Sequence, residues 1–263
     1  MSNEHAQSSP LGRLAARGTV WTILGFGGTQ VIRLGANLVL TRLLFEEAFG
    51  LMALVWVFLV AINLFSDLGI GPSIIQNERG EDPDFFNTAW TLQIGRGALI
   101  WIATAIGSIP FAYFYEEPEL RLLLPVCGLT AVLAGFNSTK LYDIQRKLDL
   151  KRRVLIDVAG AVIGSAVMIV LAYQWRSVWA LAVGSIISSA VTLLLSHVAI
   201  PGPGNRLKFE RKAFGTLVRF GRWIFVSTML TFFVSHSDRL IFGKLLPMSM
   251  LGVYSIGANL AAL

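Results

Sequence analysis

The stretch TQVIRLGANLVLTRLL (residues 29–44) places an arginine inside an apolar run that is long enough to cross a membrane. Gln30, Arg33, Asn37 and Thr41 are spaced three or four residues apart, so they share one face of a helix. An uncompensated arginine at the centre of a membrane helix costs about 2.5–3.5 kcal/mol on insertion scales. Such residues tend to face a water-filled cavity or a partner. The stretch therefore predicts a membrane helix with a polar stripe along a cavity wall.

The composition of the whole chain favours the membrane class. Of its 263 residues, 54% are hydrophobic and only 14% are charged, whereas soluble domains carry about 25% charged residues. The mean hydropathy is +0.64. The single cysteine and the scattered histidines predict neither an internal disulfide nor a metal site. The net charge of +6 does not predict nucleic acid as a partner, because membrane proteins concentrate lysine and arginine in cytoplasmic loops.

Seven apolar runs reach the roughly 20 residues that a spanning helix needs. They lie near residues 20–44, 49–70, 86–115, 120–138, 154–175, 178–200 and 214–236, and an eighth begins near residue 250. The runs predict an all-α polytopic membrane protein. Its expected parts are a cytoplasmic tail at 1–16, a six-helix transmembrane bundle at 17–200, a cytoplasmic linker at 201–213 and the start of a second bundle at 214–263.

Basic residues are shared unevenly between the two sides of this predicted protein. With the N-terminus inside, fifteen lysines and arginines fall on cytoplasmic segments and five on outer segments, while Arg33 and Arg96 fall within the membrane. Because basic residues accumulate in cytoplasmic loops, the bias predicts a cytoplasmic N-terminus. The densest inner group, at residues 140–153, would also suit anionic membrane lipids or a cytoplasmic partner.

An internal repeat links the two ends of the chain. RLLFEEAFGLMAL (residues 42–54) aligns without a gap to KLLPMSMLGVYSI (residues 244–256) at an offset of 202 residues, with Gly50 over Gly252. Six predicted helices separate the two copies, so both run in the same direction, as in the parallel halves of some transporters. A complete second copy would extend well beyond residue 263. We therefore expect the sequence to be a truncated product or a fragment.

Four stretches resemble the start of Wzx-type oligosaccharide flippases. They are LTRLLFEEAFGLMALVWVFLVAINLFSDLGIGPSIIQ (residues 40–76), FNTAWTLQIGRGALIW (86–101), QRKLDLKRRVLIDV (145–158) and SDRLIFGKLLPMSMLGVYSIGANLAAL (237–263). These flippases belong to the polysaccharide transporter branch of the superfamily that also holds MATE antiporters. The resemblance implies two six-helix bundles around a central cavity. The present sequence departs from that pattern by lacking most of the second bundle.

The resemblance also implies a function. Such a protein would move a polyprenyl-pyrophosphate-linked oligosaccharide across the bacterial inner membrane for lipopolysaccharide or exopolysaccharide biosynthesis. It would be a transporter rather than an enzyme, with no cofactor, although a proton or sodium gradient could drive it. A polysaccharide polymerase and the export machinery would be candidate partners, besides the cargo and the membrane lipids.

Two arginines are the leading candidates for contact with the pyrophosphate. Arg96 lies ten residues past Phe86, roughly 15 Å into the membrane, and Arg33 lies at a similar depth. Guanidinium groups donate forked hydrogen bonds to phosphate oxygens. We predict Arg33 first and Arg96 second as ligands. The alternative for each is a buried pair with a carboxylate or a side chain that reaches for the interface. The further candidates at this site are Gln30, Asn37 and Gln93.

Other polar residues are candidates for gates or for ion coupling. Asn63 and Asp67 fall at the inner end of the second run, where they could form an inner gate or a capping network. Asp157 falls near the inner face, and Asp238 with Arg239 at the outer end of the seventh run. Each also suits an interfacial structural role. The GFGG stretch (residues 25–28) predicts close helix packing rather than a phosphate loop.

Three other functions compete with flipping. A MATE-type small-molecule antiporter for cationic drugs would favour carboxylates in the cavity, whereas arginines are predicted there. A membrane glycan polymerase or ligase would carry a large outer loop with polar catalytic residues, and the predicted outer loops are short. An inactive truncated remnant of a flippase is the third alternative.

Overall fold

The computed structural model describes residues 10–67, 69–76, 79, 82–202 and 204–261, without the side chains of residues 10–17, 218, 220–227 and 259–261. These residues form ten helices and no strand, which confirms the predicted all-α fold. The helices are α1 (Pro10–Leu43), α2 (Glu46–Phe65), α3 (Ile70–Gln76), α4 (Pro83–Tyr115), α5 (Leu120–Phe136), α6 (Lys140–Arg146), α7 (Leu150–Trp175), α8 (Trp179–Val198), α9 (Arg211–Leu245) and α10 (Met248–Ala261).

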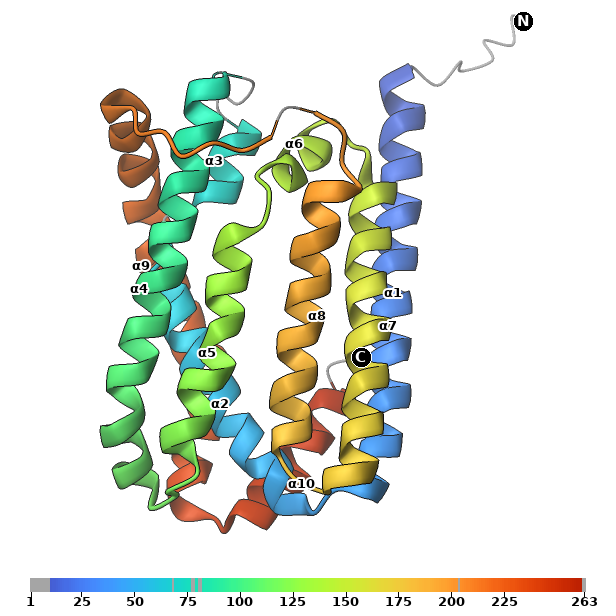
Figure 1. Ribbon diagram of the computed structural model, residues 1–263, viewed down its shortest axis with the longest axis vertical. Helices are drawn as coiled ribbons and strands as arrows, with labels where there is room; N and C mark the ends of the chain where they lie inside the picture. Colours follow the sequence, from blue (N-terminus) through green and yellow to red (C-terminus); the bar gives the residue numbers. More distant parts are fainter. Residues whose placement is uncertain (1–9, 68, 77–78, 80–81, 203, 262–263) are drawn as a thin grey trace, which may run out of the picture.

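The long helices lie alongside one another, and their connections gather at two opposite ends (Figure 1). The lower end carries the turns between α1 and α2, α4 and α5, α7 and α8, and α9 and α10. The upper end carries the start of α1, the short helices α3 and α6, and the segment that joins α8 to α9.

Several helices have the length and composition of membrane spans. Five qualify within the described residues: α2, α4, α7, α8 and the Gly18–Leu43 part of α1. Helices α5 and α6 are bent by 61° at a short break and pass the same test together. The chain is therefore a multi-pass membrane protein, as predicted. The predicted seventh span falls in α9, where several side chains lie outside the described set, and it stays a prediction.

The second predicted span ends earlier than its hydropathy suggests. Helix α2 stops at Phe65 rather than near residue 70, and α3 begins after a short break. Gly69 adopts a φ of 59°, and its N–H donates to Asp67 Oδ1 at 2.9 Å. Aspartate and glycine stabilise such turns, the first by accepting a backbone hydrogen bond and the second by tolerating positive φ. The apolar run is thus two helices joined by a polar break.

Helices pack through close approaches at glycine. The main packed pairs are α4 with α5, α7 with α8, α1 with α7 and α2 with α10. A Cβ atom added to Gly97 of α4 would lie 2.6 Å from Ala131 O of α5. One added to Gly25 would lie 2.5 Å from a Val154 methyl, whereas one on Gly27 would meet no atom within 4 Å. Small residues allow membrane helices to pack this closely, so the packing prediction for residues 25–28 is confirmed at Gly25.

The internal repeat coincides with helix ends. Helix α1 ends at Leu43 and α9 at Leu245, while α2 begins at Glu46 and α10 at Met248. Both pairs of residues differ by the offset of 202 that the sequence alignment gives. Helices α1 and α9 also both run from the upper to the lower end (Figure 1). Helices α9 and α10 therefore repeat α1 and α2 in direction and in register.

Candidate functional site

The polar stripe of α1 lies on the surface of the bundle. Helix α1 packs on α7, leaving the Arg33 side chain exposed and Gln30 and Asn37 half-buried. Gln30 borders an open hollow along this helix, together with Phe26 and other α1 residues. Among the described residues, none forms a hydrogen bond or ion pair with Arg33. The stripe can therefore be reached by a ligand from outside the bundle.

Arg96 has a different environment. Its Nε donates to Ser66 O at 2.8 Å and to Ser66 Oγ at 3.2 Å, and its Nη2 donates to Asn63 O at 2.7 Å. These oxygens belong to the last turn of α2, where backbone carbonyls lack partners within the helix. A cation also suits the negative end of a helix dipole. Arg96 thus caps α2, with the Asp67 carboxylate near enough to attract it electrostatically.

The structure does not bring Arg33 and Arg96 together. Arg33 lies on α1, which packs on α7, whereas Arg96 lies on α4, which packs on α5 and α9 (Figure 1). Similar depth along two helices does not make them neighbours, so the sequence could not establish a shared anion site. Arg96 instead joins Asn63 and Asp67, which the sequence assigned to a separate gate. A capping network, which the sequence offered as the alternative to an inner gate, is present at the end of α2 and includes Arg96.

Gln93 is held at a helix end rather than in a cavity. Its side chain is buried, and Nε2 donates to Ala134 O, Gly135 O and Asn137 O at 3.0, 3.2 and 3.1 Å. These carbonyls end α5, just before the bend into α6. The amide therefore satisfies backbone groups that a buried helix end would otherwise leave without partners. The Gln93 amide thus contacts the end of α5, and a role for Gln93 at the cargo site stays a prediction.

The remaining gate and coupling candidates lie on α7 and α9, and two of them have side-chain partners. Asp157 pairs with Arg153 one turn earlier on α7, at 2.9 Å. Asp238 Oδ2 accepts a hydrogen bond from Tyr254 Oη at 2.5 Å, which joins α9 to α10. Arg239 is half-buried next to it. Asp157 thus has a local structural partner, whereas Asp238 connects two helices of the second repeat.

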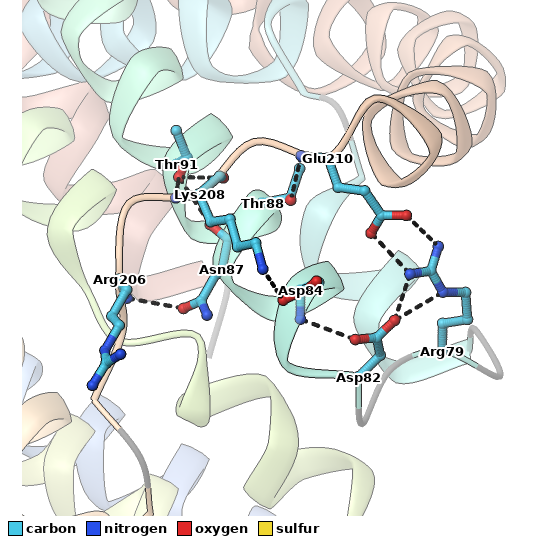
Figure 2. A network of polar contacts seen from close by, with 9 residues as sticks. All are labelled: Arg79, Asp82, Asp84, Asn87, Thr88, Thr91, Arg206, Lys208 and Glu210. Atoms are coloured by element: carbon cyan, nitrogen blue, oxygen red, sulfur yellow. Dashed lines mark hydrogen bonds and ion pairs between the residues drawn. The ribbon is translucent and has the colours of Figure 1, made fainter.

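A polar network at the upper end was not anticipated from the sequence (Figure 2). It joins the first turns of α4 to residues 205–210, which we call the strap and which the sequence assigned to a linker. Three N–H groups on alternate strap residues donate to α4 side chains: Arg206 to Asn87 Oδ1 at 2.8 Å, Lys208 to Thr91 Oγ1 at 3.0 Å and Glu210 to Thr88 Oγ1 at 3.0 Å. An extended segment directs every second N–H to one side, so the strap binds α4 as an edge strand would bind its neighbour.

Ion pairs reinforce the strap. Lys208 Nζ lies 2.6 Å from Asp84 Oδ1, and Arg79 pairs with both Asp82 and Glu210. Hydrogen bonds from Arg79 hold the pKa of the Asp82 carboxyl below its ordinary value. Hydrogen bonds to Glu210, and then to Asp82, raise the pKa of Arg79. Arg79 therefore holds the strap to the loop before α4.

Replacing Arg79 with glutamine should loosen the strap, because Glu210 and Asp82 lose the cation that they share. Exposed ion pairs contribute little singly, so we expect trypsin to cleave within the strap roughly two to five times faster. Mass spectrometry of limited digests would count cleavage after Arg206 and Lys208, relative to cleavage at the other basic loops.

Lys151→Gln is the matched control, since Lys151 is an exposed basic residue of α7 outside the strap. It should leave the relative rate of strap cleavage unchanged. Equal cleavage of the strap in both variants would show that Arg79 does not hold it.

The chain is similar to one described family and to several curated proteins. The family described as polysaccharide biosynthesis protein matches residues 39–263. The lipopolysaccharide biosynthesis protein WzxC of Escherichia coli is 24% identical over 242 residues, covering 91% of this chain and 47% of that protein. The succinoglycan biosynthesis transport protein ExoT of Rhizobium meliloti is 19% identical over 251 residues, covering 95% and 50%. The teichuronic acid biosynthesis protein TuaB of Bacillus subtilis is 18% identical over 205 residues, covering 78% and 42%.

These comparisons agree with the resemblance carried by the sequence motifs. No solved structure matches the chain. The chain spans about half the length of the curated relatives it matches. The family match nevertheless extends from the end of α1 through every later helix. The resemblance to Wzx-type transporters is thereby confirmed, and the chain belongs to the polysaccharide biosynthesis protein family.

Proposed function

We propose that this chain belongs to a transporter that flips polyprenyl-pyrophosphate-linked oligosaccharide across the bacterial inner membrane. The proposal rests on its family, on relatives named for lipopolysaccharide, succinoglycan and teichuronic acid biosynthesis, and on the word transport in one of those names. The candidate spans supply a membrane-embedded body for such a task. We therefore group the protein with transporters rather than with enzymes.

Arg33 is the observation that carries this proposal. It is an exposed arginine on a candidate span and has no hydrogen-bond partner among the described residues. A charge at that position needs water or an anion, and a pyrophosphate accepts the forked hydrogen bonds of a guanidinium. Gln30 and Asn37 would add donors on the same helix face. Since Arg96 and Gln93 donate to backbone carbonyls, we propose that those two support the fold around the cargo.

Arg33→Ala should weaken binding of a polyprenyl pyrophosphate to the purified chain in lipid nanodiscs by roughly 10- to 100-fold. The estimate reflects charge-assisted hydrogen bonds worth about 1.5–3 kcal/mol, with 1.4 kcal/mol for each factor of ten in affinity. The affinity of Arg33→Lys should lie between those of the unmodified chain and Arg33→Ala, because an ammonium keeps the charge but cannot donate the paired hydrogen bonds of a guanidinium. Microscale thermophoresis with a fluorescent polyprenyl pyrophosphate would measure the affinities.

Arg121→Ala is the matched control, since Arg121 is an exposed arginine of α5 at the lower end. Its affinity should equal that of the unmodified chain. If Arg33→Ala is folded and binds with unchanged affinity, Arg33 does not bind the pyrophosphate.

We also propose that the upper end is cytoplasmic. The distribution of basic residues supports this, because the group at residues 140–153 and those of the strap all lie at that end. Anionic lipids would then meet α6 and the start of α7. Asp238, which joins α9 to α10, is our proposed residue for coupling to a proton or sodium gradient. A polysaccharide polymerase and export machinery are the proposed protein partners.

A further inference from the structure

Helices α2 and α10 cross at two glycines that the internal repeat relates. A Cβ atom added to Gly50 would lie 2.1 Å from Met248 O, and one added to Gly252 would lie 2.1 Å from Glu46 O. Neither distance is possible for a real side chain, so only glycine permits this approach. The two backbones also touch directly, because each of these Cβ positions lies within 3.3 Å of the other glycine's N atom.

The contact is reciprocal. Gly50 and Gly252 differ by the repeat offset of 202 residues, and so do Glu46 and Met248. Gly50 of the first repeat thus meets Met248 of the second, while Gly252 of the second meets Glu46 of the first. Exchange of equivalent contacts in this way defines a two-fold interface. The crossing therefore lies on the axis that relates the two repeats, at the lower end of the bundle.

Neighbouring contacts fasten the same end. A Cβ atom added to Gly243 of α9 would lie 2.5 Å from a Leu54 methyl and 2.9 Å from the Tyr115 ring. Tyr115 Oη donates to Leu240 O at 3.0 Å. Lys244 Nζ lies 2.8 Å from Glu116 Oε1.

Each of these contacts joins the second repeat to α2 or to the end of α4. They fasten the second repeat to the first at the lower end through backbone contact, one buried ring and one ion pair.

We infer that the crossing of Gly50 and Gly252 is a gate that closes the lower end of the transport path, an inference that rests on the proposed transport function. Cargo can leave at this end only when the two helices separate. Closure in turn requires both glycines, because a methyl group on either would collide with a backbone carbonyl that has no flexible end to move aside. The Lys244–Glu116 pair and Tyr115 hold the closed state and break when the gate opens.

Cysteine accessibility tests the gate without any cargo. Ser255 is buried on α10, one turn beyond Gly252, so Ser255→Cys in a Cys127→Ala background reports on the lower end. With both glycines present, a water-soluble maleimide should label this cysteine slowly in native membranes. Gly50→Ala and Gly252→Ala should each raise the labelling rate at least tenfold, and by similar factors, because the contact is reciprocal.

Gly35→Ala in α1 and Gly257→Ala in α10 are the matched controls, since a Cβ at either would meet no atom within 4 Å. In both controls the cysteine at position 255 should be labelled as slowly as in the chain that keeps all its glycines. The gate is refuted if the crossing variants keep native circular dichroism and label like these controls, or if only one of the two accelerates labelling.

A second measurement applies if the alanine variants do not fold. Cysteines at Glu116 and Lys244, joined by a short bifunctional thiosulfonate before maleimide is added, should hold the gate closed and slow labelling of Ser255→Cys further. Unchanged labelling after cross-linking would overturn the inference. Failure of Arg33→Ala to alter polyprenyl pyrophosphate binding would instead count against the cargo proposal and leave these labelling results unaffected.

Discussion

Arg96→Leu is expected to lower the melting temperature of the protein by roughly 5–10 °C, whereas Arg33→Leu should leave it unchanged or slightly higher. Arg96 donates three hydrogen bonds to the final turn of α2. Leucine would remove these donors inside a membrane bundle, which leaves Asn63 O only the Ser66 hydroxyl at 3.2 Å. A buried acceptor that loses its donor costs about 1–3 kcal/mol. Arg33 has no partner among the described residues, so its removal breaks no contact within the fold.

The comparison separates a structural arginine from one that is available to cargo. Cys127, the one cysteine of the chain, is 2% exposed, so a thiol-reactive dye would report unfolding during a thermal ramp in detergent. Arg96→Lys should recover part of the loss, because one ammonium can reach some of the carbonyls that the guanidinium bridges. Equal melting temperatures for Arg96→Leu and Arg33→Leu would show that the cap on α2 does not stabilise the fold.

Hydropathy and the internal repeat predicted much of this fold, because both are patterns along the chain that can be read without knowing which segments are close in space. Apolar runs locate spans through the cost of polar groups in lipid, and the offset of 202 residues in the sequence also relates the observed ends of α1 and α9. The Asp67–Gly69 break escaped that approach, since apolar residues continue on both sides of it. Two turn-forming residues within a long apolar run change its averaged hydropathy too little for the break to be detected.

Neighbour relations are the part that the sequence could not provide. The sequence predicts similar depths for Arg33 and Arg96, but a predicted depth does not tell which helices pack together. The strap was missed for a related reason, since polar residues between two spans look like any solvated linker. One signal was present: acceptors at Asp84, Thr88 and Thr91 follow a helical spacing on α4, and the strap carries Lys208, whose side chain pairs with Asp84. Only the structure shows that α4 and the strap lie close enough for these groups to bind one another.

Gly97→Leu should strongly destabilise the protein. The Cβ atom alone would lie 2.6 Å from Ala131 O and 3.2 Å from Gly135 Cα, so α4 and α5 must move apart. Overpacking of a well-packed interface costs about 1–3 kcal/mol, and a clash with a backbone carbonyl belongs at or above the upper limit. Separation would also break the three hydrogen bonds of Gln93, which lies one turn before Gly97 on the same face.

Gly95→Leu is the matched control for this change. It introduces the same side chain two residues away on α4, where an added Cβ meets nothing within 4 Å. Its thermal transition, followed through Cys127, should stay within a few degrees of the unmodified chain, whereas that of Gly97→Leu should fall by roughly 10 °C or be lost. Gly97→Ala carries the test if the leucine variant does not accumulate. Similar stability for Gly97→Ala and Gly95→Leu would mean that the backbone contact between α4 and α5 does not hold Gln93 against the end of α5.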